Sequence, residues 1–427
     1  MLPLNEINFR LCKYRIDSII LNVPDIGEYQ VNTFGLGDFV IEKVFDGFQY
    51  PYFRVFISVP NKVFRAMRKN HHEITAYVRV LYAYFNPEET SGAPGLKIKE
   101  QTYISDNFVV ELEDSSPHLT TDTEELSEKQ TLTDDKGPDP QHMTTMEILL
   151  YKQNDMNIIK KLPTVVYHNA TIMDILTDYL RLAGLHNVLC SPANNNSKRY
   201  SQFIIPPMRV DEQILRICCD YGLHKYGTSF FMDFDKPYII EKINKCTAWV
   251  PNEYKTIYVV NPNFSNQVSS ITKGCSYETK DHCGYCTMLT AQSDAPSMER
   301  EQVFGSSIYA LDKHTGNYTE IRPDVTTIRG GGNISRVVGS YYGDPSTIKA
   351  LEQRIKEDTN VMTVILDAVD LTMLEPNKLY KLCFTVPSQT KYDGDYRLVK
   401  YHASFTLSDG IWFTPNVVAT FVGDKPK

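Results

Sequence analysis

The 427-residue sequence lacks the features of a membrane-spanning, exported or disulfide-stabilised protein. No apolar run approaches the roughly 18 residues that a membrane-spanning helix needs, so we expect no membrane insertion. The N-terminal stretch MLPLNEINFRLCKYR has no apolar signal core, which argues against export by that route. The nine cysteines are odd in number and irregular in spacing. This usage indicates reduced thiols inside a cell and not a disulfide framework.

Positive charge is also scarce. The chain has 44 Lys and Arg against 52 Asp and Glu, a formal net charge of −8. A general basic surface for binding nucleic acid is therefore not expected. The acidic excess is local, because residues 113–139 hold nine acids and two lysines, a net of −7, and the other 400 residues carry about −1. A single acidic segment accompanies a nearly neutral body.

No catalytic constellation is evident, and we predict no catalytic residue, no cofactor and no metal. The most suggestive cluster is Cys275, His282, Cys283 and Cys286, in which Cys283 and Cys286 form a CxxC. A structural zinc site needs four ligands, and the chain has no second CxxC. The alternative is that these residues are unpaired thiols and a histidine in or beside strands. A metal held by this cluster stays open as the less favoured interpretation.

Three other groupings of chemistry-bearing residues lack the spacing of known sites. These groupings are His71-His72-Glu73, Gly330-Gly331-Gly332, and Asp312 with His314. The histidine pair lies in a polar turn without the HExxH spacing, and we expect it to face solvent. The glycine run has no strand-to-helix context and no following Lys-Ser or Lys-Thr, so it predicts a turn, and the chain has no GxSxG.

Aromatic residues are abundant, at 11% with 27 Tyr and 20 Phe, and favour a β-rich fold. Strands are expected near 53–59, 74–85, 107–114 and 145–151. Between the last two, residues 115–141 are rich in Ser, Thr, Asp, Glu and Pro and cannot bury enough apolar surface to fold. We interpret this segment as a mobile acidic loop between two paired strands. The alternative is a linker between two domains.

Two amphipathic helices are predicted in the middle of the chain. In 170–185, Thr171 is a candidate N-cap with Asp174 three residues on, and Gly184 ends the helix. In 210–223, Asp211 is the candidate cap. Strands are expected at 228–234 and 237–243, and a third helix at 344–358. The C-terminal strands are expected near 361–370, 378–386, 396–407 and 411–422, with Asp409-Gly410 as the hairpin turn between the last two.

The order of these elements resembles the baseplate hub proteins of contractile phage tails and the hub portion of type VI secretion spike proteins. The resemblance is carried by TIMDILTDYLRLAGL, by DEQILRICCDYGLHKYGTSFFMDFDKPYII, and by the Gly184-Leu185 and Tyr221-Gly222-Leu223 helix ends. LEPNKLYKLCFTV resembles a characteristic strand of that family. GDYRLVKYHASFTLSDGIWFTPNVVATFV is similar to the closing hairpin of its second barrel. The likeness spans most of the chain in element order.

The resemblance implies an α+β, mainly β fold with two tube-like antiparallel β-barrel domains, a smaller α/β domain and a loop-rich insertion. The expected domains are a first barrel at 1–160 with its acidic insertion at 115–141, and an α/β middle domain at 161–250. A second barrel is expected from 251–290 and 344–424, and the loop-rich insertion at 291–343. The sequence stops at Lys427, just after the last strand, so we expect the spike to be a separate chain.

The function implied is structural. A homotrimer would present six similar barrels as a ring that joins a hexameric tail tube, or a tube-initiator protein, to a separate trimeric spike. Baseplate wedge proteins are further possible partners, and DNA would pass only transiently through the lumen. The protein would be located in the virion, in the tail baseplate, after assembly in the host cytoplasm. The alternatives are a host-binding tail fibre or adhesin module, or a tail-associated hydrolase.

Overall fold

A computed structural model describes most of the N-terminal and C-terminal parts of the chain and scattered strands between them. No helix among the described residues has the length and apolarity to span a membrane. The acidic segment at 115–141 and the helix expected at 344–358 lie outside the description. The described residues are 11–32, 36, 38–45, 48–85, 99–113, 143–193, 196, 198–218, 223–224, 228–234, 236–241, 255–259, 277–278, 283–284, 292–293, 308–311, 318–321, 359–376, 378–384, 387–409 and 411–424.

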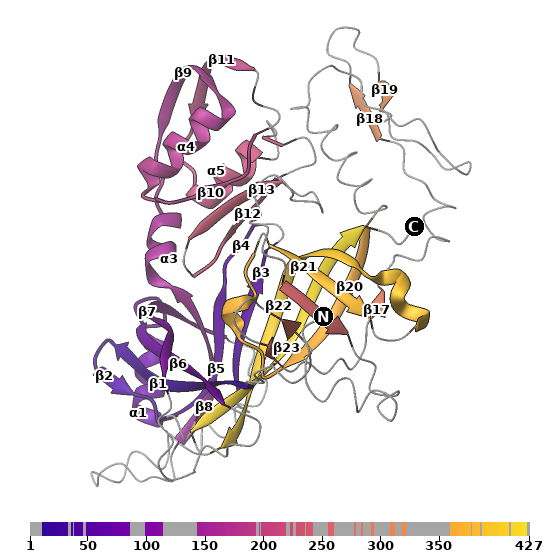
Figure 1. Cartoon of the computed structure of the whole chain (residues 1–427). Helices are drawn as coiled ribbons and strands as arrows, with labels where there is room; N and C mark the ends of the chain where they lie inside the picture. Colours follow the sequence, from indigo (N-terminus) through magenta and orange to yellow (C-terminus); the bar gives the residue numbers. More distant parts are fainter. Residues whose placement is uncertain are drawn as a thin grey trace.

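Eight antiparallel strands close into a barrel, which we call the first barrel. Neighbouring strands pair in the ring order β22-β3-β5-β8-β7-β6-β1-β23, and β23 pairs back onto β22. Six of these strands come from the N-terminal part of the chain and two from its C-terminal end (Figure 1). Their bounds are β1 (Leu11–Val23), β3 (Phe39–Val44), β5 (Tyr52–Pro60), β6 (Thr75–Phe85), β7 (Gln101–Leu112), β8 (Met143–Lys152), β22 (Gly394–Asp409) and β23 (Trp412–Asp424).

The barrel interior is packed with apolar and aromatic side chains. Along β5, Phe53, Val55, Ile57 and Val59 are fully buried, while the residues between them are only half-buried. This alternation is what a strand with one buried face requires. The ring of Phe53 lies edge-on to that of Phe108, with 5.3 Å between centroids. Eight strands enclose an interior that side chains can fill, so this barrel is a solid core.

A second group of strands continues from the same C-terminal pair. Its pairing order is β16-β15-β14-β21-β22-β23-β20-β17, so it also counts eight strands among the described residues. Its two end strands, β16 and β17, are separated in the chain by residues 285–291 only. The bounds are β14 (Lys255–Val259), β15 (Tyr277–Glu278), β16 (Cys283–Gly284), β17 (Gln292–Ser293), β20 (Thr359–Asp367) and β21 (Leu379–Phe384).

The mainly β class with an antiparallel barrel, predicted from the sequence, is therefore confirmed. The domain boundaries remain predictions. The shorter elements that complement the sheets are β2 (Gly27–Gln30), α1 (Asn61–Lys69), α3 (Gln153–Ile159), β18 (Ile308–Leu311), β19 (Tyr318–Ile321), and the 3₁₀ turns at Leu371–Met373 and Pro387–Tyr392.

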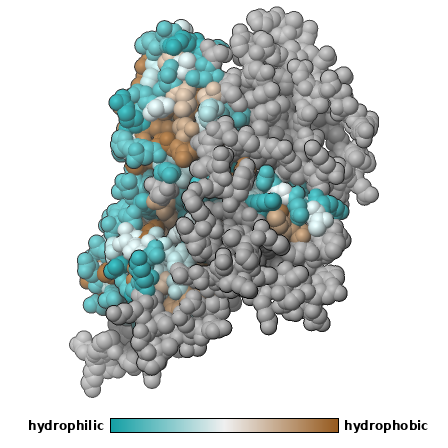
Figure 2. Space-filling model, viewed as in Figure 1, coloured by the Kyte–Doolittle hydropathy of each residue, from teal (hydrophilic) through white to brown (hydrophobic). Residues whose placement is uncertain are grey.

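The middle region, residues 165–241, has its own apolar core of helices and short strands. Its four-stranded sheet has the order β10-β13-β12-β4, and β11 pairs with β9 as a separate ribbon. Figure 2 shows apolar patches over this region, where α4 and α5 expose Leu182 and Leu215. The bounds are β4 (Phe48–Gln49), β9 (Val165–Thr171), α4 (Ile172–Ala183), β10 (Leu189–Cys190), β11 (Arg199–Ile205), α5 (Val210–Arg216), β12 (Thr228–Met232) and β13 (Pro237–Glu241).

Helix α4 forms where the sequence predicts it. The Thr171 hydroxyl accepts from the Asp174 amide, and the Asp174 carboxylate accepts from the Thr171 amide, which completes a capping box. Gly184 ends the helix with φ of 98°, a left-handed conformation that glycine adopts without strain. The apolar face of this amphipathic helix is buried, and it consists of Ile172, Ile175, Leu176, Tyr179, Leu180 and Ala183.

Helix α5 differs from the prediction at its start. Its N-cap position is Arg209 and makes no side-chain capping bond, so the expected Asp211 cap is wrong. Asp211 lies in the first turn instead, where its carboxylate accepts two hydrogen bonds from the Arg209 guanidinium, at 3.1 and 2.7 Å. The amphipathic pattern of this helix predicts an apolar face with Ile214, Leu215 and Cys218; Leu215 is instead 41% exposed, whereas Ile214 and Cys218 are buried.

The strands that flank the acidic segment are neighbours in the barrel. β7 and β8 pair antiparallel, with Leu112 opposite Ile148 and Phe108 opposite Lys152. The prediction of two paired strands around the segment is confirmed, which favours an insertion into one sheet over a linker between domains.

Candidate functional site at the junction of the two sheets

The C-terminal hairpin belongs to both groups of strands. Near its turn, β22 pairs with β3, with Lys400 opposite Val44, and β23 meets β1 where Phe413 lies opposite Tyr14. Towards its open end, β22 pairs with β21 and β23 pairs with β20. The sequence predicted this hairpin as the closing element of the second barrel alone. The structure places it in both sheets, because each strand is long enough to contribute one end to each.

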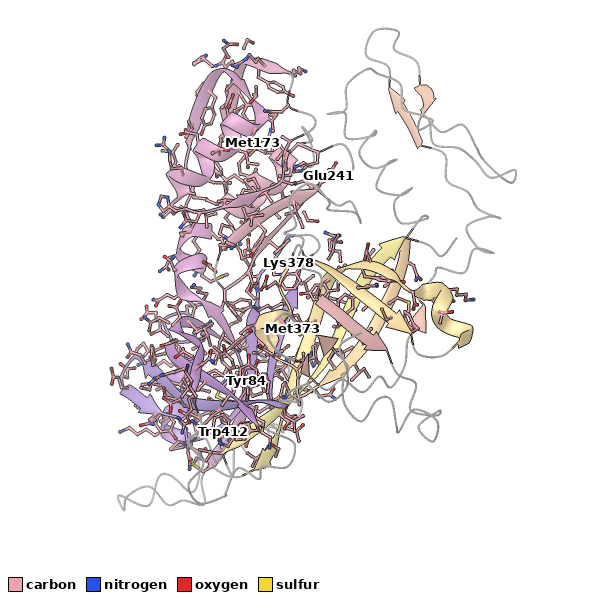
Figure 3. All side chains as sticks on the ribbon, in the orientation of Figure 1. Tyr84, Met173, Glu241, Met373, Lys378 and Trp412 are labelled. Atoms are coloured by element: carbon pink, nitrogen blue, oxygen red, sulfur yellow. The ribbon has the colours of Figure 1, made fainter. Side chains whose placement is uncertain are left out.

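The connection between β20 and β21 docks onto the first barrel through a buried polar cluster. Figure 3 labels Tyr84 of this cluster and Met373 of the connection. The Tyr84 hydroxyl donates to Oδ2 of Asp370 at 2.6 Å. The Leu371 amide donates to the Tyr14 hydroxyl at 2.7 Å. Asp370 itself caps the following 3₁₀ turn, accepting from the Thr372 amide at 2.9 Å and from its hydroxyl at 2.6 Å. The carboxylate thus holds two segments far apart in the sequence.

The main chain reinforces this contact. The Cys12 amide donates to the Ala368 carbonyl at 3.0 Å, and the Ala368 amide donates to the Pro415 carbonyl at 2.8 Å. Ala368 has φ of 50°, a left-handed conformation that an L-residue adopts only at a cost. The surrounding bonds therefore fix a turn that local preference disfavours, where β20 leaves the second group of strands.

The hydroxyls of Tyr14 and Tyr84 and the Cys12 thiol have raised pKa values beside the Asp370 carboxylate. Burial raises the pKa of Tyr84 and of Tyr14 well above the usual range, and the nearby Asp370 charge raises both further. Burial and the same charge also raise the pKa of the Cys12 thiol. Hydroxyls and a thiol with raised pKa values are donors and packing groups, not nucleophiles. The arrangement is suited to joining sheets.

The outward face of the barrel beside the hairpin is polar. The Tyr52 hydroxyl donates to Glu42 at 2.7 Å, and the Glu42 carboxylate also lies 3.7 Å from Nδ1 of His402. On the next strands Arg54 and Glu147 form an ion pair at 3.0 Å. Burial, then the neighbouring Glu113, raises the pKa of Glu147. These polar side chains on the outer face are therefore paired with one another across neighbouring strands.

A serine–histidine contact that the sequence analysis missed lies in the middle region. The Ser191 hydroxyl is 2.8 Å from Nε2 of His224, and the Thr228 hydroxyl is 3.0 Å from Nδ1. Burial lowers the pKa of His224. The imidazole is fully buried, and its second nitrogen faces a hydroxyl where a catalytic triad has a carboxylate. The contact therefore ties β10 to the start of β12, and only long-range folding brings its residues together.

The residues singled out from the sequence are mostly outside the description. Cys275, His282 and Cys286 lie outside it, as do Asp312, His314 and the glycines at 330–332. Cys283 is in β16, but its side chain is not described. His71 and His72 are exposed as predicted, with ring centroids 3.7 Å apart. In the part of the chain that is described, no three His, Cys, Asp or Glu side chains gather as a metal site.

A protein-family model, Bacteriophage PBS1 gene 109 protein, matches residues 12–411, which is nearly the whole chain. The chain belongs to this family. No curated protein matches it. The sequence-based recognition of a phage protein is thereby confirmed, and the fold agrees with the expected barrel architecture.

Several solved structures are similar to this chain. A tail protein from Neisseria meningitidis MC58 is 11% identical, with a TM-score of 0.46, and the match covers 95% of this chain and 96% of that one. The 43 kDa tail protein of prophage MuSo2 from Shewanella oneidensis is 12% identical, with a TM-score of 0.45 and coverages of 94% and 97%. A component of the E. coli type VI secretion system is 8% identical, with a TM-score of 0.37 and coverages of 93% and 76%.

Proposed function

We propose that this phage protein is a structural tail hub. Three chains form a ring that joins a hexameric tail tube, or its initiator, to a separate trimeric spike in the virion baseplate, and that lets DNA pass through its centre. Baseplate wedge proteins can contact the outside of the ring. In this proposal the protein carries out no catalysis.

The observation that carries the proposal is the hairpin shared by two eight-stranded groups. β22 and β23 pair with each other along most of their length and with different neighbours at the two ends. Among the described residues each group has eight strands, and the shared hairpin joins the two groups. Three copies then offer six similar units, which is what an adaptor between sixfold and threefold partners requires.

Two further features support the proposal. The chain belongs to a bacteriophage family and its element order resembles hub proteins. Outside residues 113–139 the body carries about −1 of net charge, so its net charge does not favour tight binding of DNA phosphates in a lumen. Each contact between subunits is expected to bury well above about 1,000 Å², since the ring must survive the forces of injection.

The test is the mass and symmetry of the particle. The full-length chain would be purified alone, and also after co-expression with the tail proteins encoded by the same phage. Native mass measurement should give about three times 48.9 kDa for the ring, in one or both conditions. Electron micrographs should show a central hole with threefold or pseudo-sixfold symmetry.

The C-terminal hairpin is unsuitable as a deletion site for testing the ring. Deleting the C-terminal hairpin would not separate assembly from folding, because β22 and β23 also complete the first barrel. The particle measurement on the intact chain avoids this difficulty. A stable monomer in both conditions, or an assembly with twofold symmetry, contradicts the hub.

A further inference from the structure

A lysine occupies an interior position of the first barrel. Along β3 the inward side chains are Phe39, Ile41 and Lys43, and the first two are fully buried. Lys43 continues this series and is only 7% exposed. An ammonium group in an apolar barrel is costly unless it is paired. A buried ammonium at this position therefore needs a partner within reach of the barrel interior.

The partner is Asp233, which directly follows β12 in the middle region. Its Oδ1 lies 2.5 Å from Nζ of Lys43, and the aspartate is 8% exposed. The ammonium also lies 4.6 Å from the ring centroid of Phe234 and 5.9 Å from that of Tyr401. The charge is thus enclosed by one carboxylate and by aromatic faces, which attract a cation.

Phe234 enters the same end of the barrel. Its ring stacks on Phe53 with centroids 4.9 Å apart and planes 9° apart, and its carbonyl accepts from Nζ of Lys152 at 2.6 Å. Phe53 pairs near the start of β5, and Lys152 is the last residue of β8. Lys43, Phe53 and Lys152 therefore mark one mouth of the barrel, and the turn after β12 fills it.

We propose that Asp233 and Phe234 form a plug in this mouth of the first barrel, and that the Lys43–Asp233 ion pair fixes the middle region there in one orientation. Phe234 adds to the pairing of β12 with β4 and to the packing of Phe231 on Phe45, whose ring centroids lie 5.4 Å apart. The ion pair adds a polar constraint to these contacts, because the carboxylate must reach the ammonium in the barrel mouth. Lys43 is thus a positioning residue for the middle region.

The plug also has hydrogen bonds within its own turn. The Asp233 amide donates to the Lys236 carbonyl at 2.9 Å, and Oδ1 of Asp233 accepts from the Phe234 amide at 2.7 Å. The carboxylate therefore orients the residue that follows it as well as the lysine opposite. In the proposed hub, a partner bound to the middle region would be held at a fixed angle to the ring.

The test compares the buried pair with an exposed pair of the same residue types. Hydrogen exchange would be measured on the full chain for Lys43→Met, Asp233→Asn and the double variant. The Asp233 amide reports on the plug, and the Val55 amide reports on the barrel. Each single change should raise opening of the plug roughly a hundredfold or more, as expected for a buried charge left alone. The double variant should open much less than the product of the two.

The matched control is Lys69 and Asp25, which form an exposed pair at 2.8 Å. Lys69→Met and Asp25→Asn should change exchange less than about fivefold, as exposed pairs do. If the variants of the exposed pair raise amide exchange as much as those of the buried pair, the proposal is overturned. It is also overturned if the Lys43 and Asp233 variants lower the protection of the Asp233 and Val55 amides equally, because the Lys43–Asp233 ion pair would then belong to one undivided core.

A second variant keeps the test informative if the charge variants do not fold. Phe234→Ala leaves both charges in place and removes the stacking on Phe53. It should open the plug while the Val55 amide stays protected. Unchanged protection at Asp233 in this variant overturns the plug. All readouts concern the single chain, so the result is independent of whether the ring forms.

Discussion

Tyr84 and Asp370 are 286 residues apart in the sequence, yet the tyrosine hydroxyl donates a hydrogen bond to the aspartate at 2.6 Å. Tyr84 lies in β6 on the wall of the first barrel, and Asp370 follows β20 in the second group of strands. Because the aspartate is 2% exposed, water cannot replace the hydroxyl readily. The bond is a direct link between the two parts, in addition to the shared hairpin.

Tyr84→Phe should lower the free energy of unfolding by about 1–3 kcal/mol. The change removes a donor from a buried carboxylate and leaves the ring in place. Urea denaturation monitored by circular dichroism would measure it. The control is Tyr77→Phe, because the Tyr77 hydroxyl contacts the Ser105 hydroxyl at an exposed position, 2.7 Å away. An equal loss in both variants would show that the Asp370 link adds nothing.

Thr171→Ala should destabilise the protein by about 1 kcal/mol, because α4 loses its side-chain cap. Thr177→Ala is the matched control, since Thr177 is exposed in the same helix and alanine is the better helix former. The control should be neutral or slightly stabilising. The urea midpoint of Thr171→Ala should lie below that of the parent, and the midpoint of Thr177→Ala should not. An equal fall of the midpoint in both variants would contradict the capping role.

Helix α4 could be predicted from the sequence because its determinants are local. Thr171, Asp174 and Gly184 lie within fourteen positions, and the apolar stripe repeats with the helical period. The α5 cap failed for an equally local reason. Arg209 and Asp211 lie two positions apart, and the Asp211 carboxylate binds the Arg209 guanidinium in the first turn instead of capping the helix.

The junction could not be predicted in the same way. The sequence indicates that β22 and β23 form a hairpin, but their partners in the first barrel, such as Val44 for Lys400, are hundreds of residues away. Pairing at that distance leaves no pattern in one sequence. The position of Lys43 does have a sequence pattern, since strand alternation places it on the same face as Phe39 and Ile41. This pattern predicts a partner, and only the fold identifies Asp233.

Acid should weaken the middle region through His224. Burial lowers the pKa of this histidine below its usual value near 6.5, so the unfolded chain binds the proton more readily. The stabilising contribution is present at pH 7.5 and is lost as the pH falls below about 6.5, with a slope of at most about 1.4 kcal/mol per pH unit. His224→Gln should flatten this part of the stability profile. An unchanged slope would contradict the account.

Protonation of Asp155 should increase the stability of the folded chain as the pH falls, in contrast to His224. Burial raises its pKa to about 6, well above the usual aspartate value, so the folded chain binds the proton first. Its protonation adds stability as the pH falls from about 6 towards 4. Asp155→Asn removes this compensation. The urea midpoint of the variant should therefore fall more steeply than that of the parent between pH 7 and pH 5, and parallel profiles would refute the assignment.

Gly423 should be the most sensitive position of the shared hairpin. It lies opposite Tyr396 in β22 and opposite Asn360 in β20, at the end that belongs to the second group of strands. A Cβ placed on Gly423 would lie 2.6 Å from Cδ1 of Tyr396 and 3.0 Å from the Asp395 carbonyl oxygen. Tyr396 is buried and its hydroxyl donates to the Tyr392 carbonyl at 2.7 Å, so the ring has little freedom to move.

Gly423→Ala should therefore cost about 1–3 kcal/mol through overpacking. Gly394→Ala is the control in the partner strand, because a Cβ there meets only Tyr396 at an ordinary 3.8 Å. Hydrogen exchange should locate the damage in β20 and β21, while β5 and β8 keep their protection, since they pair only within the first barrel. If protection falls equally in all four strands, the hairpin transmits strain between the two groups, and they unfold as one unit. If Gly394→Ala costs as much as Gly423→Ala, the close approach of Tyr396 is not what requires glycine.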